Sequence, residues 1–500
     1  MKKNFYIAIF CVYVFTSCSK DLDQTPISAA TSETFYATRI DFLQGIYSVY
    51  NSLRGYPDRQ FYLSETRSDN IYGVSDGGVW AWEGINDFHK TIASNQYISE
   101  AYTSDFNGIY KANVLLDKLQ ANGTVIGDAV LQKRLEAEAK FLRAFYYFDL
   151  IRWFGKVPLI DHPVSSAEAL NIGRSPVSDV YNLVISDLKF AADNLLDVYP
   201  DVDKGRVTKS AAKGILALVY MTRSGPTYGI DGPGLASNEW NLALPLLNDV
   251  LANPRYSFLP SYSSIFSYNN ENNAEVILDV EFKAGSNPLL GSGFSAALVP
   301  ATYFRSLSLV DQVGIFIRPV SNNLANSYEA GDIRKPFTIL TTGYTYNGLL
   351  ENRPFYIKYL DVTKQPAVAN DWPINFIVLR YTDVLLLKAE CVLHGAPGSQ
   401  TTDVDAVVNK IRVRAGLSGQ KANITLPQLF EERRKELAGE GFRWHDLVRS
   451  GLIETIIPAW IAADDIKHQI QPFEKNFIIY PIPQAEMDVK QDFYTQNAGY

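Results

Sequence analysis

The segment RSDNIYGVSDGGVWAWEGINDF, residues 67–88, concentrates side chains that could act chemically on a ligand. Two carboxylates could hydrolyse a glycosidic bond as an acid–base pair if they lay roughly 5–10 Å apart. Tryptophan and tyrosine rings could instead hold a sugar, because the apolar C–H faces of a sugar stack flat on an aromatic ring. The segment therefore allows cleavage or binding of a carbohydrate. Its acids are Asp69, Asp76, Glu83 and Asp87.

The binding hypothesis singles out particular residues. Trp80 and Trp82 are two positions apart, so in an extended loop their rings share one face. Polar side chains of the same segment could hydrogen-bond to sugar hydroxyls, and a second loop-rich region supplies two further tyrosines. The competing interpretation is that one of the tryptophans packs the loop onto the rest of the protein. The candidate ligand-binding residues are Trp80, Trp82, Arg67, Asp69, Asn70, Tyr72, Tyr303 and Tyr344.

Other catalytic patterns lack the context that they need. Residues 73–77 match the G-x-S-x-G nucleophile pattern, but they lie in a polar stretch without the strand that must precede the nucleophile. The five histidines show no metal-ligand spacing. The sequence contains neither a phosphate-binding loop ending in GK[ST] nor the spacing of an EF-hand. We therefore predict a protein with no catalytic residues, no cofactor and no metal site.

The run ERRKELAGEGFRWHDLVRSG, residues 432–451, alternates basic and acidic side chains. On a helix spanning 426–449 these charges fall three or four apart along one stripe, where each can pair with the next. Carboxylates neutralised in this way are poor general acids, and alternating signs do not attract phosphate. The net charge of −8 also argues against nucleic acid as a partner. We interpret the run as a structural ion ladder of Arg433, Glu436, Glu440, Arg443, Asp446 and Arg449.

Helical periodicity dominates the remaining sequence, and these helices have to position the candidate residues. Two pairs of segments carry a tetratricopeptide-like pattern, in which small residues allow two helices to approach closely. The first pair is 206–223 with 238–253, and the second is 382–394 with 402–414. Helices are predicted at 39–54, 97–121, 128–154, 177–196, 206–223, 238–253, 382–394, 402–414 and 426–449.

One predicted helix, at 128–154, is apolar nearly all round in the run FLRAFYYFDLIRWF. It is therefore expected in the core, where Arg143 and Asp149 must find partners. Residues 55–96 and 255–375 lack helical periodicity, and the second region mixes short β-like runs with long loops. Loops of this length usually carry function. The predicted fold is mainly α, a scaffold of tetratricopeptide-like helical hairpins with long loops and a few short β-strands.

The N-terminus has the pattern of a bacterial lipoprotein leader. Two lysines precede an apolar stretch that is too short to span a bilayer, and small residues then precede Cys18. We predict a signal peptide at 1–17, lipidation of Cys18 and a polar tether at 18–38. No later segment is long and apolar enough to span a bilayer, so this pattern predicts a lipid-anchored protein.

Several distinctive stretches follow one another along the chain. They are DFLQGIYSVYNSLR (41–54), EAKFLRAFYYFDLIRWFGKVPLI (138–160), GRVTKSAAKGILALVYM (205–221), LRYTDVLLLKAE (379–390), IRVRAGL (411–417), the charged run 432–451 and YPIPQAEMDVKQDFYTQNAGY (480–500). With the cysteine box at Cys18, they resemble in sequence and order the SusD/RagB family, the surface nutrient-binding lipoproteins of Bacteroidetes. The resemblance runs from Cys18 to Tyr500.

The resemblance implies a helical scaffold with variable loops that build the ligand site. It implies an N-terminal helical region at 39–254, with a C-terminal RagB/SusD region at 255–500 packed on it as one unit. A family member would be anchored in the outer membrane, facing the cell exterior. It would pass oligosaccharides to a SusC-type TonB-dependent transporter without cleaving them. A peptide ligand and a glycoside hydrolase using the loop carboxylates remain the alternatives.

Overall fold

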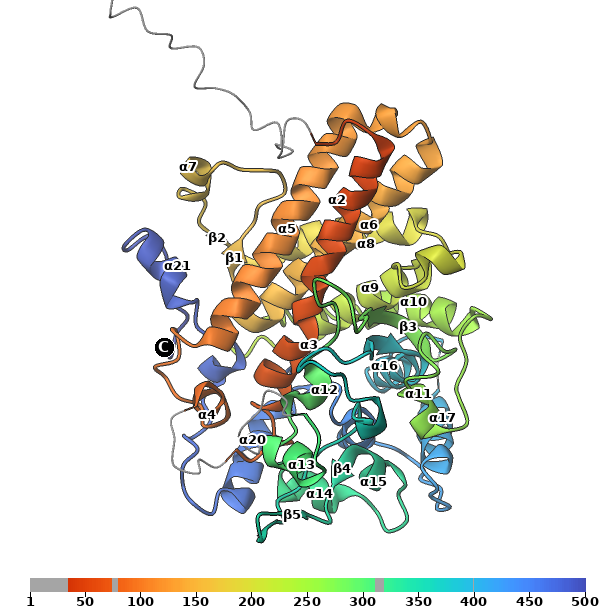
Figure 1. Cartoon of the computed structure of the whole chain (residues 1–500), viewed down its shortest axis with the longest axis vertical. Helices are drawn as coiled ribbons and strands as arrows, with labels where there is room; N and C mark the ends of the chain where they lie inside the picture. Colours follow the sequence, from red (N-terminus) through yellow and green to blue (C-terminus); the bar gives the residue numbers. More distant parts are fainter. Residues whose placement is uncertain (1–34, 74–79, 311–318, 399) are drawn as a thin grey trace, which may run out of the picture.

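The computed structural model describes residues 35–73, 80–310, 319–398 and 400–500. Helices dominate these residues, and the strands are short and paired two by two (Figure 1). The predicted mainly helical fold is therefore confirmed. Cys18 and positions 74–77 of the G-x-S-x-G match lie outside the described residues. Within those residues, no helix combines the length and the apolar character needed to cross a membrane.

The N-terminal half is a layer of long helices, of which α2, α5 and α6 run side by side in the upper part of Figure 1. From α5 to α10, each long helix packs against the next one along the chain. The predicted hairpins are present, because α9 packs on α10 and α16 packs on α17. The long helices are α2 (Arg39–Asn51), α5 (Gln96–Asn122), α6 (Ala129–Phe154), α8 (Val177–Asn194), α9 (Lys209–Ser224), α10 (Trp240–Ala252), α16 (Tyr381–Leu393) and α17 (Thr401–Arg414).

Helix α6 is buried along its whole C-terminal half, as its sequence predicts. Its two interior charges are both paired. The Arg143 guanidinium donates to both carboxylate oxygens of Asp187, over 2.8 and 3.0 Å. Asp149 accepts hydrogen bonds from Arg59 and Arg152 over 3.1 and 2.9 Å. The prediction that these charges find partners is confirmed.

The prediction that residues 55–96 are not helical is wrong. This region contains α3 (Tyr56–Arg59), a π-helical turn η2 (Gln60–Glu65) and α4 (Ala81–Asn86). The turns are too short to show a helical period in sequence, and residues 59–61 and 63–71 are all buried. Tertiary packing therefore sets the conformation of this region.

The C-terminal half combines short helices with paired strands. Antiparallel β3 (Val276–Val280) and β8 (Phe376–Arg380) form the best-buried pair. The other pairs are β1 (Val157–Pro158) with β2 (Arg174–Ser175), β4 (Ile339–Leu340) with β7 (Phe355–Tyr356), and β5 (Tyr344–Tyr346) with β6 (Leu349–Glu351). The remaining helices and turns are η1 (Ser52–Gly55), η3 (Gly123–Ile126), α7 (Ser166–Ala169), η4 (Asp201–Asp203), α11 (Tyr262–Ile265), α12 (Phe294–Ala297), α13 (Ala301–Ser306), α14 (Asn322–Ser327), α15 (Arg334–Thr338), η5 (Val362–Lys364), α18 (Leu426–Leu437), α19 (Arg443–Ser450), α20 (Ile453–Asp464), η6 (Lys475–Ile478) and α21 (Gln484–Val489).

The charged run is not one continuous helix, which corrects the prediction for 426–449. Helix α18 ends at Leu437 and α19 begins at Arg443. Two glycines of the intervening turn, Gly439 and Gly441, have φ angles of +75° and +81°. A Cβ atom on Gly441 would lie 2.4 Å from the Cβ of Gln60. The break follows from backbone conformations that favour glycine and from the close approach of η2.

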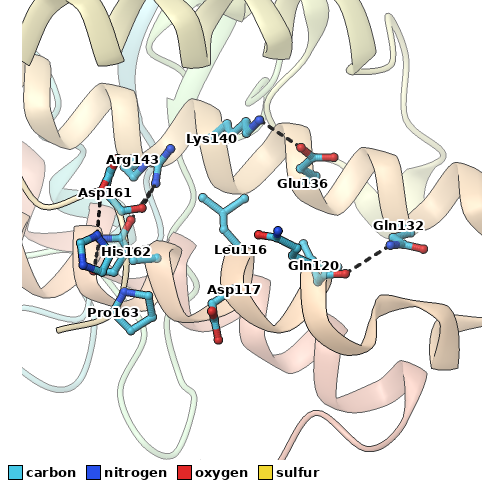
Figure 2. Close-up of a pocket in the computed structure, with 12 residues that line it drawn as sticks. Leu116, Asp117, Gln120, Gln132, Glu136, Lys140, Arg143, Asp161, His162 and Pro163 are labelled. Atoms are coloured by element: carbon cyan, nitrogen blue, oxygen red, sulfur yellow. Dashed lines mark hydrogen bonds and ion pairs between the residues drawn. The ribbon is translucent and has the colours of Figure 1, made fainter. Parts of the chain in front are cut away.

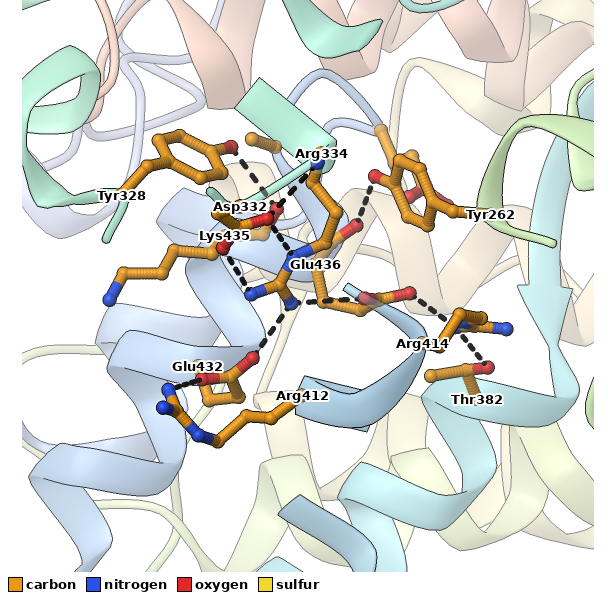
Figure 3. Close-up of polar contacts among 12 residues, drawn as sticks. Tyr262, Tyr328, Asp332, Arg334, Thr382, Arg412, Arg414, Glu432, Lys435 and Glu436 are labelled. Atoms are coloured by element: carbon orange, nitrogen blue, oxygen red, sulfur yellow. Dashed lines mark hydrogen bonds and ion pairs between the residues drawn. The ribbon is translucent and has the colours of Figure 1, made fainter. Parts of the chain in front are cut away.

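The charges of the run pair mainly with other elements, so the expected ladder of neighbouring pairs is wrong for most of them. Figure 3 shows Glu436 facing Arg334 and Arg414, which come from α15 and α17. The Glu436 carboxylate lies 3.1 Å from Arg334, 2.9 Å from Arg380 and 2.6 Å from Arg414. Glu440 pairs with Arg380 over 2.9 Å and with Lys358. All six side chains are at most 1% exposed.

This buried ion network, defined as Glu436, Glu440, Arg334, Lys358, Arg380 and Arg414, joins α15, β8, α17 and α18. Burial raises the pKa of Glu436, but the guanidinium groups of Arg414, Arg380 and Arg334 outweigh it and lower that pKa below its ordinary value. Each member thus depends on its partners, because an unpaired charge in this interior would be costly.

Glu436→Gln should lower the free energy of unfolding by about 3–5 kcal/mol, because the variant leaves three buried guanidinium groups short of one carboxylate. In the parent, the stabilisation from Glu436 is present above the unfolded pKa near 4.5 and is lost as the pH falls towards the lower folded pKa. The variant should therefore lose less stability than the parent on acidification. Urea unfolding at pH 7 and pH 4 measures both effects.

Glu454→Gln is the matched control, because Glu454 forms an exposed pair with Lys475 at 2.9 Å. This variant should lower the free energy of unfolding by less than about 1 kcal/mol. Equal losses of unfolding free energy in Glu436→Gln and Glu454→Gln would contradict the structural role of the network.

Gly441→Ala should destabilise the protein by about 2 kcal/mol or more, because it adds a clash with Gln60 to the strain of a left-handed backbone. Gly395→Ala is the control, since Gly395 has a φ of +77° but no atom lies within 4 Å of the position that its new methyl group would take. Conformational strain alone should cost about 1 kcal/mol there. Thermal unfolding measures the difference, and equal losses would mean that the turn can move away from η2.

Candidate functional site

The two loop-rich regions of the sequence meet at one β-bridge. Ile71 pairs with Val320 in antiparallel orientation, and the Tyr72 amide donates to the Pro319 carbonyl over 2.9 Å. This junction brings together segments about 250 residues apart in sequence, a separation that only long-range packing can bridge. Of the candidate aromatic residues, Tyr72 belongs to this junction directly.

Trp80 is the most exposed of the candidate aromatic residues, with 37% of its surface accessible. It occupies the extended position immediately before α4, and its backbone amide donates to the Glu83 carboxylate over 3.1 Å. The Asn95 side chain donates to the Ala81 carbonyl over 2.6 Å and ties this helix start to the beginning of α5. Trp80 is thus a partly accessible residue on a backbone that is held in place.

Trp82 does not share the face of Trp80, which corrects the expectation from their spacing. Because α4 begins at Ala81, the two residues are not on an extended strand. Trp82 is only 4% exposed, and its ring packs so closely on Gly73 that a Cβ atom there would lie 2.1 Å from it. Trp82 therefore follows the competing interpretation, in which a tryptophan packs this region onto the scaffold.

Arg67, a second predicted ligand contact, is fully buried. Its guanidinium lies 4.2 Å from the centre of the Tyr480 ring and donates to the Tyr500 hydroxyl over 2.7 Å. It connects the first loop-rich region to the C-terminal residues. The prediction that Arg67 faces a ligand is wrong, because aromatic rings surround its charge in the interior.

Asp69 and Asn70 are also interior residues, so their predicted contact with a ligand is wrong. Asp69 pairs with Arg443 over 2.8 Å and with Arg434 over 3.0 Å. The Arg434 side chain also donates to the amide oxygen of Asn70 over 2.8 Å. Burial raises the pKa of Asp69, but Arg434 and Arg443 outweigh it and lower that pKa. Both residues fix the base of the loop to the charged run.

The three candidate tyrosines are half-buried. The Tyr72 hydroxyl donates to Asp465 over 3.1 Å. Tyr303 of α13 and Tyr344 of β5 form an edge-to-face pair with ring centres 5.3 Å apart, and the Tyr344 hydroxyl lies 2.5 Å from that of Thr302. The structure therefore brings Tyr303 and Tyr344 together as a pair. Each is partly accessible to a ligand and partly committed to packing.

Sequence reasoning missed Asp465, an acidic neighbour of Asp87. Burial, followed by the charges of Glu83 and Asp465, raises the pKa of Asp87 to about 7. Asp465 could not be found from the sequence of the loop, because it lies far along the chain, directly after α20. It already accepts from Tyr72 and from the amides of Gln469 and Ile470. A carboxyl group that titrates near neutrality is what general acid catalysis requires, so Asp87 is where the hydrolase alternative would have to act.

A polar groove of about 380 Å³ lies between α5 and α6 (Figure 2). Several of its polar groups pair with neighbouring groups. Lys140 pairs with Glu136 over 3.0 Å, and Arg143 donates to the Asp161 carbonyl over 2.7 Å. No Trp, Tyr or Phe is among its lining residues. The groove therefore offers no aromatic platform for a sugar ring, unlike the face that carries Trp80.

In residues 35–73, 80–310, 319–398 and 400–500, no group of three or more His, Cys, Asp or Glu side chains is arranged to hold a metal ion. The candidate aromatic residues with accessible surface are Trp80, which is 37% exposed, and the half-buried pair Tyr303 and Tyr344 in the second loop-rich region. Aromatic faces of this kind can stack on a ligand.

Two family models match long parts of the chain. Residues 21–221 match the family model described as "Starch-binding associating with outer membrane", and residues 341–500 match the model described as "SusD family". The curated SusD-like protein P25 of Formosa agariphila is 26% identical, with 97% of each chain covered. The starch-binding protein SusD of Bacteroides thetaiotaomicron is 21% identical, over 97% of this chain and 96% of that one.

Solved structures share the fold over nearly the whole chain. A laminarin-binding SusD-like protein superimposes with a TM-score of 0.75 at 27% identity, covering 93% of this chain and all of that one. The matches to both family models, the end-to-end similarity to SusD-like proteins and the shared fold agree with one another. The chain belongs to the SusD/RagB family.

Proposed function

We propose that this protein is a non-catalytic binding protein that captures oligosaccharides on the face carrying Trp80 and delivers them to a SusC-type TonB-dependent outer-membrane transporter. The observation that carries the proposal is that Trp80 is 37% exposed, whereas the polar residues Asp69 and Asn70 of the same segment are buried and paired. A ring on a rigid base can stack on a sugar with little cost in ordering. Tyr303 and Tyr344 are proposed as additional contacts.

The relatives support an oligosaccharide as the ligand. One solved relative is named for binding laminarin and one curated relative for binding starch. Both names specify a polysaccharide. Delivery to a transporter is the role expected from family membership, and the description of one matching family model as associating with the outer membrane supports it.

The N-terminal pattern supplies the anchor in this proposal. A chain lipidated at Cys18 and carrying the tether 18–38 would hold the binding face at the outer membrane, exposed to the exterior. The acyl chains would then be the only strong hydrophobic attachment, since no described helix can span a bilayer.

A glycoside hydrolase is the second candidate, and the raised pKa of Asp87 is the observation that favours it. Two features weigh against this candidate. Asp87 is 7% exposed, whereas a general acid must reach the glycosidic oxygen. Its neighbour Asp465 is held by three hydrogen bonds, which support the loop from within.

Trp80→Ala should weaken binding of the tightest-binding glycan by about 2–4 kcal/mol, because truncation of a central aromatic anchor removes the stacking face. The melting temperature should change little, since the ring is substantially exposed. Calorimetric titration with laminarin and starch oligosaccharides, followed by a panel of bacterial, host and plant glycans, measures the affinity. The same samples, analysed for glycan chain length after incubation, should show no shortening.

Tyr110→Ala is the matched control, because Tyr110 is an aromatic residue on α5 that is 53% exposed. It should leave glycan affinity unchanged. Trp82→Ala should instead lower the free energy of unfolding by about 3–5 kcal/mol, as expected for a buried indole. Unaltered affinity in Trp80→Ala would contradict the proposed site, and glycan shortening that Asp87→Asn abolishes would establish the hydrolase.

Cys18→Ala should move the protein from the membrane pellet to the soluble fraction, because it removes the proposed site of acylation. Fractionation in cells that lack the transporter avoids retention through a protein partner. A variant that remains in the pellet after a salt wash would contradict the lipid anchor.

A further inference from the structure

A cavity whose lining residues do not include Trp80 is built by the C-terminal segment against the helical layer. Helix α21 and the residues that follow it close over α5, α7 and the end of β1, and these elements lie on one side of the molecule in Figure 1. The volume of this pocket, which is open to solvent on one side, is about 370 Å³. No step of the proposed glycan capture uses this pocket.

Aromatic rings form two walls of this C-terminal pocket. Tyr102 and Phe106 of α5 lie with ring centres 4.7 Å apart, and Phe493 and Tyr494 lie 5.2 Å apart on the opposite segment. Leu170 adds an aliphatic side chain that is 41% exposed. The pocket is thus an apolar cavity with π-faces, the kind of surface that holds an organic ligand.

One carboxylate in this pocket is left without a partner. Glu486 is half-buried among the lining residues. Among the described residues, no hydrogen-bond donor and no cation pairs with its side chain, although the neighbouring Asp488 accepts from Gln484 over 2.8 Å. Burial alone raises the pKa of Glu486. The pocket therefore contains a partly accessible carboxylate that no described protein group neutralises.

The nearby cations are engaged by groups other than Glu486, and the Lys490 ammonium also lies 4.2 Å from the centre of the Phe493 ring in the pocket wall. The Lys490 ammonium lies 3.0 Å from both the Leu170 carbonyl and the Asn171 side chain. Arg174 donates to the Lys156 and Thr495 carbonyls over 2.8 and 2.6 Å. Neither side chain makes an ion pair with Glu486, so its negative charge is available to a ligand.

We propose that the C-terminal pocket binds a ligand that presents a primary ammonium group on an apolar body, with the ammonium at Glu486 and the body between the aromatic walls. A carboxylate attracts an ammonium group through its charge, and the faces of aromatic rings attract it as well. Known ammonium-binding cages combine such groups. A neutral sugar would find few hydrogen-bond partners here, because Glu486 is the one lining carboxylate and Lys490 is engaged. The inference is independent of glycan binding at Trp80.

Ligand-observed NMR titration of the whole folded protein with n-pentylammonium, n-pentanol, glucosamine and glucose tests the proposal. The charged member of at least one pair should bind more tightly than its neutral counterpart. Glu486→Gln should weaken that binding roughly tenfold, the value of one charge-assisted hydrogen bond. Binding of glucosamine would identify the ligand as an amino sugar. Binding of pentylammonium without binding of glucosamine would identify it as an amine on an alkyl chain.

Asp488→Asn is the matched control, since it removes the same charge from the same short helix outside the pocket lining. It should leave ammonium binding unchanged. Phe493→Ala tests the aromatic wall, and its melting temperature reports whether the fold is retained. Equal affinity for charged and neutral probes, no binding of either ammonium probe, or equal effects of Glu486→Gln and Asp488→Asn would each overturn the proposal.

Discussion

Pairing of buried charges is the constraint on which the rest of this structure depends. The run 432–451 carries its charges into an interior where an unpaired ion would be costly, and the partners come from four distant parts of the chain. Glu436 alone holds guanidinium groups from α15, β8 and α17. The short C-terminal elements are positioned by these contacts, since few of them are long enough to be stable by themselves.

The same principle fixes the base of the candidate site. Asp69 lies between Arg443 and Arg434, so the loop that leads to Trp80 is tied to the charged run. Arg67 adds a second attachment through the Tyr480 ring and the Tyr500 hydroxyl. A binding residue is more effective when the shell beneath it is rigid. The buried polar residues therefore support the proposed site, in which the partly exposed Trp80 is the residue proposed to meet the ligand.

The sequence predicted the long helices, both tetratricopeptide-like hairpins and the need for partners at Arg143 and Asp149, because periodicity and burial are local signals. It did not predict the break in the charged run, which depends on the approach of Gln60 to Gly441. It also placed Arg67, Asp69 and Asn70 at the ligand, because polar residues in a glycine-rich segment usually lie on the surface. Their partners lie more than 360 positions away, and no local pattern reveals such a distance.

The division between buried scaffold charges and an exposed binding face is the central claim, and a double-mutant cycle at Asp69 and Arg443 tests it most directly. Asp69→Asn, Arg443→Met and the double variant are compared in urea unfolding and in calorimetric titration with the tightest-binding glycan. We expect a coupling free energy of about 1–3 kcal/mol in unfolding, with unchanged affinity in the folded fraction. A loss of affinity at unaltered stability would show instead that this pair contacts the ligand.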